Sequence, residues 1–374
     1  MSHSLVPMLC RLPGDEGNPG DVFIAIGLQQ VLDDALGKHG APLPWLSLSK
    51  FKPGHVKKHI DLVKEAGFLI IGGTPQFNNY DDWCFWYDRE FWQDFIVPNN
   101  IKVFPLAGGG GYPSNTMNPR EFADHCLKSE ETRRILGIRC DHSPFFTVRD
   151  EHAYTLLKKF DRAPEVRHLA CTATFAGKSR NIEWKGGRLL IVPPSPGLVP
   201  VKYVLDNTGG MDGDAIAKAK IDKIMKLFIE CGDALGEEYV MKPIYVAHYF
   251  PEYLLLKQYG IPEDHIFFTN DYYRLLQMYA TADCVLSARL HGALPPFGMC
   301  GPKVVHVGID SRMGAIDYFE EHIPNLKIQD LTPEVAVEAM EEAQAWSESE
   351  CHQEYWENQV MFYRERIRAA GFLQ

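Results

Sequence analysis

One local pattern recurs along the chain: a short apolar run, a turn rich in glycine or charge, and then a helix-compatible segment. A clear copy has its run at 284–286, its turn at 287–289 and its helix-compatible segment at 290–297. Continuous apolar runs are typical of parallel strands that are buried on both faces, with helices as crossovers between them. The pattern therefore predicts an α/β fold with parallel sheets, in which ligands bind beyond the carboxyl ends of the strands.

Glycines follow two of the predicted strands. The run 68–71 precedes two glycines, and the run 103–107 precedes four, which include Gly109 and Gly110. A glycine lets the backbone come close either to a ligand or to a packed helix, and the sequence leaves both interpretations open. We expect glycine loops that open on one edge of the sheet, with Gly109 and Gly110 among the residues that contact a ligand.

Cationic side chains come directly after other predicted strands. Arg149, His248 and Arg289 each follow an apolar run, and His291 lies two residues beyond Arg289. An Arg offers a planar fork for phosphate or carboxylate, and a His can transfer a proton near neutral pH. The alternatives are structural: an Arg149–Asp150 salt bridge, a surface acid that pairs with Arg289, or a His291 that caps a helix.

The turn 13–21 precedes a helical period that begins at residue 22. Asp21 in this turn either caps the helix or belongs to a ligand site. The glycine spacing does not match the G-x-G-x-x-G fingerprint of dinucleotide-binding proteins. A nicotinamide-dependent oxidoreductase is therefore a remote option.

The length of 374 residues predicts two domains. The pattern loosens over residues 163–185, where we expect linker structure, and a new series of strands begins at 188–192. We predict Rossmann-like domains at 1–178 and 179–345 that face each other across a cleft, followed by a helical segment at 346–374 that packs back across the domains. We also expect helix from residue 332 to the end, and a helix after His291 that Pro295 and Pro296 interrupt.

Composition excludes several classes of protein. The net charge is −11 and no long basic run is present, which argues against nucleic acid as a partner. Nine cysteines without a Cys-x-x-Cys pair indicate reduced thiols in a cytoplasmic protein rather than a zinc site or a disulfide framework. We expect no signal peptide, no transmembrane segment and no metal, although peripheral contact with a lipid-linked glycan stays compatible with such a chain.

Five segments, in order, resemble motifs of the polysaccharide pyruvyl transferase family, and the order and rough spacing hold from about residue 14 to residue 320. They are Asn-Pro-Gly-Asp at 18–21, Leu-Ile-Ile-Gly-Gly at 69–73, Leu-Ala-Gly-Gly-Gly at 106–110, Thr-Val-Arg-Asp at 147–150 and Ser-Ala-Arg-Leu-His-Gly at 287–292. The chain departs from the family at 308–312, where an aromatic-Asp-x-Lys segment is often present and Arg312 stands in place of the Lys.

The resemblance implies a fold similar to GT-B glycosyltransferases and a transferase of cytoplasmic polysaccharide or exopolysaccharide biosynthesis. Its donor would be phosphoenolpyruvate, a co-substrate rather than a cofactor, and its acceptor a sugar or glycan. The product would be a pyruvate ketal that bridges two hydroxyls, with phosphate released.

The chemistry of this reaction leads us to expect particular residue roles. The 179–345 domain would hold the donor and the 1–178 domain the acceptor. His291 would protonate the enol carbon, Asp21 would orient or deprotonate the acceptor hydroxyl, and Arg289 would support both donor binding and catalysis. The residues expected to bind the donor are Arg149, His248, Arg289, Leu290, His291 and Arg312, and those expected at the acceptor are Asn18, Gly20, Asp21, Gly109 and Gly110.

Two other functions fit the same plan. A nucleotide-sugar glycosyltransferase of the GT-B type would use the second-domain cations for a diphosphate, with Glu320 or Glu321 as the acid that holds a ribose. A binding protein of the same fold without turnover is the second alternative.

Overall fold

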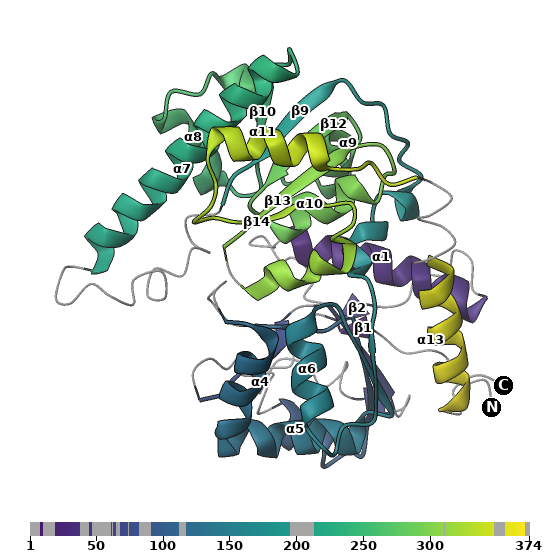
Figure 1. Cartoon of the computed structure of the whole chain (residues 1–374). Coiled ribbons are helices and arrows are strands. Elements are labelled where there is room, and N and C mark those ends of the chain that lie inside the picture. Colours follow the sequence, from purple (N-terminus) through teal and green to yellow (C-terminus); the bar gives the residue numbers. More distant parts are fainter. Residues whose placement is uncertain are drawn as a thin grey trace. The chain divides into compact units, whose positions relative to one another are not determined.

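The computed structural model describes residues 8–9, 19–37, 45–46, 61, 63–64, 68–73, 75–81, 91–111, 117–194, 213–309, 311–347 and 356–370. The chain forms two compact units, which we describe separately (Figure 1). Unit 1 comprises Met1–Tyr112, Met117–Phe175 and Ser349–Gln374, and unit 2 comprises Pro113–Thr116 and Ala176–Glu348. The limits of the folding domains, after residues 178 and 345, stay predictions.

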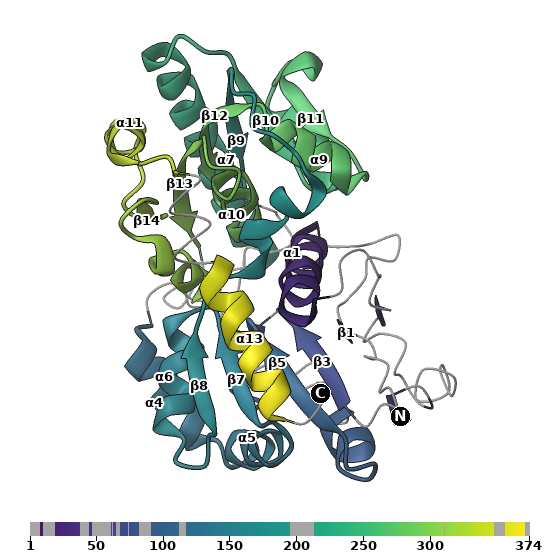
Figure 2. The same ribbon diagram turned by 90° about the vertical axis from the view of Figure 1, so that its right-hand side faces the viewer.

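Unit 1 contains a parallel sheet with the strand order β2-β1-β3-β5. An isolated bridge between Gly108 and Val148 places the parallel pair β7-β8 beside β5, as Figure 2 shows. A short ladder, β4-β6, follows the ends of β3 and β5. The strands are β1 (Met8–Leu9), β2 (Trp45–Leu46), β3 (Phe68–Gly72), β4 (Pro75–Phe77), β5 (Lys102–Leu106), β6 (Gly109–Gly110), β7 (Phe145–Val148) and β8 (Glu165–His168).

Helices cover both faces of the β7 region, because successive side chains of a strand point to opposite faces. Phe145 packs edge-on against Phe362 of the C-terminal helix, with ring centroids 5.6 Å apart. Phe146 belongs to a core cluster with residues of α4, α5 and α6. The helices of unit 1 are α1 (Pro19–Leu36), the π-helix η2 (Phe91–Ile96), α4 (Pro119–Lys128), α5 (Glu130–His142), α6 (Glu151–Lys159), the 3-10 turn η3 (Thr172–Phe175) and α13 (Glu357–Ala369).

Unit 2 is built on a six-stranded, fully parallel sheet with the order β11-β10-β9-β12-β13-β14. The first strand of unit 2, β9, lies between β10 and β12, so the strand order reverses there. In doubly wound sheets this switch point is where ligands bind. The strands are β9 (Arg188–Val192), β10 (Pro243–Ala247), β11 (Ile266–Phe268), β12 (Ala282–Ser287), β13 (Lys303–Gly308) and β14 (Asn325–Lys327).

Alternate residues of β9 pack against helices on opposite faces of the unit 2 sheet. Leu189 and Ile191 belong to a core cluster with residues of α7, α8 and α11. Val192 faces α10, where a Cβ on Gly292 would lie 2.7 Å from its Cγ1 atom. The helices of unit 2 are α7 (Gly213–Glu238), α8 (Phe250–Gln258), α9 (Tyr272–Tyr279), α10 (Leu290–Phe297) and α11 (Pro333–Glu342), with 3-10 turns η4 (Lys178–Arg180), η5 (Glu263–His265), η6 (Ser311–Ala315) and η7 (Asp317–Phe319).

The prolines after His291 do not interrupt their helix, contrary to the prediction. Pro295 and Pro296 both lie inside α10, and both are buried. Burial of the two rings offsets the backbone hydrogen bonds that proline cannot donate. Gly298 N still donates to Leu294 O at 3.0 Å, which closes the last turn.

Two further predictions of local structure were wrong. The stretch expected as linker contains β8, an edge strand in which Val166 is the one fully buried side chain. The chain from residue 332 onward is not a continuous helix, because α11 ends at Glu342 and residues 343–347 are irregular. Trp346 stacks there on Phe297, with ring centroids 4.7 Å apart and an interplanar angle of 9°.

No helix among the residues listed above is both long and apolar enough to cross a bilayer. Of the nine cysteines, the structure describes six, and no two of these six form a disulfide with each other. Burial raises the pKa of Cys140 and Cys231 to about 12, so these thiols stay protonated near neutral pH.

Candidate functional site

Asp150 organises the carboxyl end of β7 in unit 1. It is the N-cap of α6, and its Oδ1 atom accepts a hydrogen bond from Ala153 N at 2.9 Å. The same carboxylate accepts from Gly110 N, at 3.0 Å for Oδ1 and 2.9 Å for Oδ2. The side chain therefore ties the glycine segment to the start of α6, and it forms no salt bridge with Arg149.

Gly109 and Gly110 form the buried strand β6 rather than an open loop. A Cβ on Gly109 would lie 2.7 Å from Arg149 Nε and 2.7 Å from Asp150 Oδ2, and one on Gly110 would lie 3.0 Å from His152 Cβ. The lack of side chains at these positions thus makes room for Arg149, Asp150 and the first turn of α6. Close packing against these side chains explains why glycine occupies both positions, and contact of the glycines with an acceptor stays a prediction.

Arg149 is a buried cation with little compensation. Its side chain is 1% exposed, its Nη1 atom donates to Cys171 Sγ at 3.7 Å, and its Nε atom has no hydrogen-bond partner. Among the described residues, no carboxylate oxygen lies within 4 Å of a guanidinium nitrogen of Arg149, so Arg149 forms no ion pair with them. Burial of a charge without a counter-charge costs several kcal/mol, about what an anionic ligand would offset.

Arg139 provides a useful contrast, because it is equally buried and its Nε atom also has no partner, yet its other guanidinium nitrogens have several acceptors. Its guanidinium donates to the main-chain oxygen of Gln76, to Gln76 Oε1 at 3.0 Å and to the hydroxyl of Tyr80 at 2.9 Å. The rings of Phe77 and Trp92 lie 4.5 and 5.2 Å from its Cζ atom. Neutral acceptors and aromatic faces therefore explain Arg139 as a structural residue, and they do not explain Arg149.

Asp21 lies inside the first turn of α1, as its third residue, and is 7% exposed. It does not precede the helix as an N-cap would; α1 begins at Pro19 and includes Gly20. An acid in the first turn interacts favourably with the helix dipole. Asn18 lies outside the described residues, so its predicted role is not addressed by the structure.

In unit 2, Arg289 follows β12 and forms a buried ion pair with Glu252 of α8. Arg289 Nη1 lies 2.5 Å from Glu252 Oε1, and the side chains are 8% and 1% exposed. Glu252 Oε2 accepts from the backbone N–H groups of His248 at 2.6 Å and Tyr249 at 3.3 Å. The ring of Tyr249 lies 4.9 Å from Arg289 Cζ. This pair connects the ends of β10 and β12, the two neighbours of β9, and its acid is buried rather than on the surface.

His248 occupies the same edge of the sheet, at the end of β10. Its Nε2 atom lies 2.5 Å from the hydroxyl of Tyr279, and its buried Nδ1 atom has no partner. Burial, reinforced by the positive charge of Arg289, lowers the pKa of His248 well below its ordinary value of 6.5. Burial likewise raises the pKa of Tyr279. The dyad is therefore uncharged at neutral pH.

The start of α10 is shaped by Ser287 and Gly292. Ser287 Oγ donates to Arg289 O at 2.9 Å and accepts from Arg289 N at 3.1 Å. A Cβ on Gly292 would lie 2.5 Å from Ser287 Oγ, so glycine is needed for the helix to approach β12. Leu290 and His291 are the first two residues of α10, where backbone N–H groups are not used by the helix.

The remaining predicted residues are more exposed. Arg312 lies in η6, after β13, and is partly buried. Glu320 and Glu321, considered for a ribose, are exposed. Unit 2 thus places His248, Arg289, Leu290 and His291 after the ends of β10 and β12, the two strands on either side of β9, and unit 1 places Arg149 beside Gly109.

Glu252 and Tyr279 were missed by the sequence analysis. The Glu lies three residues after Tyr249, a spacing that indicates a helix cap, and it does accept from the Tyr249 N–H group. Its second role depends on Arg289, which is 37 residues away in sequence. No local pattern carries that information.

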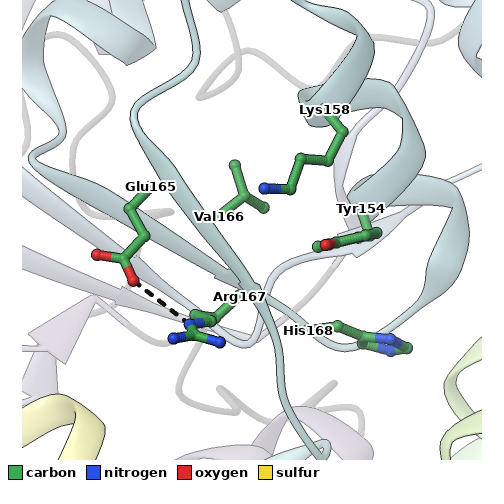
Figure 3. A pocket seen from close by; sticks show the side chains of 6 residues that line it. All are labelled: Tyr154, Lys158, Glu165, Val166, Arg167 and His168. Atoms are coloured by element: carbon green, nitrogen blue, oxygen red, sulfur yellow. Dashed lines mark hydrogen bonds and ion pairs between the residues drawn. The ribbon is translucent and has the colours of Figure 1, made fainter.

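A separate pocket of about 320 Å³ lies between α6 and β8 in unit 1 (Figure 3). Its walls carry Lys158, whose Nζ atom is 5.4 Å from the ring of Tyr154, and Arg167, which bonds Glu165 at 3.3 Å. None of the predicted site residues lines this pocket, which is formed by Tyr154, Lys158, Glu165, Val166, Arg167 and His168. Within the described ranges, no group of three His, Cys, Asp or Glu side chains is arranged to hold a metal ion; metal independence stays a prediction.

Two Rossmann-like units, each with a parallel sheet, and a C-terminal helix define an α/β protein of the GT-B-like fold class, as predicted. The model of the polysaccharide pyruvyl transferase family matches residues 18–302, and the chain belongs to this family of transferases. A search of curated protein sequences finds no match.

Solved structures with a similar fold include two UDP-GlcNAc 2-epimerases. The enzyme from Neisseria meningitidis, bound to UDP-GlcNAc, has a TM-score of 0.51 and 12% identity, over 97% of this chain and 99% of that one. The enzyme from Methanocaldococcus jannaschii, in complex with UDP-GlcNAc and UDP, has a TM-score of 0.49 and 11% identity, over 96% and 99%. At such identities the comparison establishes the fold alone.

Proposed function

We propose that the protein transfers a pyruvyl group from phosphoenolpyruvate to two hydroxyls of a sugar or glycan. The first hydroxyl oxygen bonds to C2 of the donor while C3 gains a proton, and the bond from C2 to the phosphate oxygen breaks. The second hydroxyl then closes the ketal at C2. One hydroxyl proton is accounted for on the new methyl group and the other on the released phosphate.

The observation that carries this proposal is the buried, uncompensated guanidinium of Arg149 at the carboxyl end of β7. Phosphoenolpyruvate carries both a phosphate and a carboxylate, so it needs cationic or N–H-rich contacts for each. Arg149 in unit 1 and Arg289 in unit 2 each lie at the end of a parallel strand, where such ligands bind.

The other roles follow the chemistry of the side chains. We assign proton delivery to C3 to His291, and hydroxyl orientation or deprotonation to Asp21. Arg312 and the first N–H groups of α10, at Leu290 and His291, supply further contacts for the donor anion. We assign the uncharged His248 a hydrogen bond to the donor. These roles need no cofactor and no metal.

A nucleotide-sugar glycosyltransferase is the competing proposal. The Neisseria epimerase of similar fold was solved with UDP-GlcNAc, and the cations of unit 2 would suit a diphosphate as well. A non-catalytic binding protein would retain ligand binding after His291→Ala and Asp21→Ala and would have no turnover. Ligand specificity separates these proposals.

The test is thermal stabilisation of the purified protein by phosphoenolpyruvate, uridine diphosphate or a nicotinamide dinucleotide. A ligand at 100 times its Kd adds about 2.7 kcal/mol to stability. We expect phosphoenolpyruvate to stabilise, and Arg149→Met or Arg289→Ala to abolish the shift. Stabilisation by uridine diphosphate instead would favour the glycosyltransferase, and detection of phosphate release and a ketal with wild type but not His291→Ala would exclude the binding protein.

A further inference from the structure

We propose that Glu252 is a positioning residue for Arg289: its carboxylate fixes one end of the guanidinium so that the other donors meet the anionic group of the substrate. The inference rests on the proposed function in taking the substrate as a phosphate-bearing anion. It adds a residue and a role that neither the sequence motifs nor the family match assigns.

The guanidinium is held at one corner only. An Arg has five N–H donors in a fixed plane, and Glu252 engages Nη1 at 2.5 Å. Among the residues that the structure describes, no acceptor lies within hydrogen-bond distance of Arg289 Nε or Nη2. The Tyr249 ring, 4.9 Å from Cζ, covers the guanidinium. One corner and one face are thus constrained, and donors are left for a ligand.

Glu252 is itself rigidly placed. Its side chain is 1% exposed, and its second oxygen accepts from the backbone N–H groups of His248 and Tyr249. The carboxylate therefore bonds both the backbone after β10 and the side chain of Arg289 after β12, and so fixes Arg289 relative to β10. The side chain of His248 is in turn held by the hydroxyl of Tyr279, whose side chain is fully buried. Supported side chains of this kind determine how well a ligand contact is oriented.

A simpler role for Glu252 is neutralisation of the buried Arg289 charge. The two roles predict opposite effects of Glu252→Gln, which keeps the shape and removes the charge. If Glu252 only neutralises, the variant leaves Arg289 with more net positive charge, and an anion binds more tightly. If Glu252 positions Arg289, the variant loses a charge-assisted hydrogen bond that holds the guanidinium, and an anion binds more weakly.

The experiment is calorimetric titration of the full chain with phosphoenolpyruvate and, separately, with inorganic phosphate. We expect Glu252→Gln to weaken binding about tenfold or more, because the variant loses a hydrogen bond between two charged groups. In steady-state kinetics, the donor KM should rise more than kcat falls. Binding that is unchanged or tighter in a folded Glu252→Gln protein overturns the proposal.

Glu263→Gln is the matched control, because Glu263 is an exposed acid in the same unit that bonds Tyr253 at 2.8 Å and Lys257 at 3.1 Å; its loss should leave binding unchanged. If Glu252→Gln does not fold, Glu252→Asp decides, because it keeps the charge but shortens the side chain. Positioning then predicts weaker anion binding, and neutralisation predicts anion binding equal to that of wild type. Wild type that binds phosphate but not phosphoenolpyruvate overturns the proposed donor, while the Glu252 comparison with phosphate still decides this inference. Wild type that binds neither overturns both.

Discussion

Buried arginines show how neighbouring atoms determine what a charged residue does. Arg139 and Arg149 lie in the same unit and are both 1% exposed. The Nη atoms of the first donate to oxygen acceptors and its guanidinium lies against aromatic rings, whereas among the described residues the second has one weak contact with a thiol; the Nε atom has no partner in either. Residue type and burial are the same, so the difference lies in partners.

We therefore expect opposite stability effects when each arginine is replaced by methionine. Arg149→Met should increase the free energy of unfolding by about 1–3 kcal/mol, because it removes an uncompensated charge from the interior. Arg139→Met should decrease it by about 1–3 kcal/mol, because the acceptors of Gln76 and Tyr80 lose their donor. Urea unfolding without ligand measures both. A loss of stability in Arg149→Met equal to that in Arg139→Met would identify Arg149 as structural.

His248 makes the stability of unit 2 depend on pH. Its folded-state pKa lies well below 6.5, so the unfolded chain binds more protons at intermediate pH. Stability therefore rises with pH toward about 6.5 and is lost on acidification below that value, by at most about 1.4 kcal/mol per pH unit. Urea unfolding at about pH 7 and about pH 5.5 should show a smaller pH difference in His248→Gln than in wild type. An equal difference in the two proteins would contradict this assignment.

At the scale of elements, the sequence predicts what depends on local hydrophobicity. Strand β9 has the predicted limits, 188–192, because 189–192 is a continuous apolar run. Strand β8 has no such run, since it lies at the edge of its sheet with Val166 as its one fully buried residue. The motif residues at the strand ends could be located from sequence, but the ion pair that holds Arg289 could not, because its partner comes from a different helix.

The β6 segment provides a prediction at this scale, because the space beside it is filled. Gly109→Ala should destabilise unit 1 by about 1–3 kcal/mol and weaken anion binding, since the new Cβ meets the buried side chains of Arg149 and Asp150 at 2.7 Å. Gly137→Ala in α5 is the matched control. Its Cβ would meet the end of Arg162, whose side chain is 55% exposed and free to move, and alanine adds up to about 1 kcal/mol of helix stability. Unfolding and titration of both variants test the contrast; equal losses would contradict it.

At the scale of the whole molecule, the most distant part of the chain completes unit 1. Helix α13 follows all of unit 2 in sequence, yet it packs against α1, β7 and β8 (Figure 2). The hydroxyl of Tyr363 lies 3.2 Å from Thr147 Oγ1, and the Arg364 guanidinium donates to the main-chain oxygens of Asp34 and Ala35, at the carboxyl end of α1. Unit 1 is therefore discontinuous, an arrangement that apolar patterns within α13 do not reveal.

This arrangement predicts that damage to the last helix affects one unit selectively. Tyr363 is fully buried, so Tyr363→Ala should cost unit 1 about 3–5 kcal/mol through the cavity it creates. Met361 on the same helix is 50% exposed, and Met361→Ala should change little. Hydrogen exchange read separately for the two units tests this, with faster exchange expected in β3, β5 and β7 of Tyr363→Ala and unchanged exchange in β9, β12 and β13. Equal acceleration in both sheets would mean that the units unfold together, and then the last helix stabilises the whole molecule rather than the unit against which it packs.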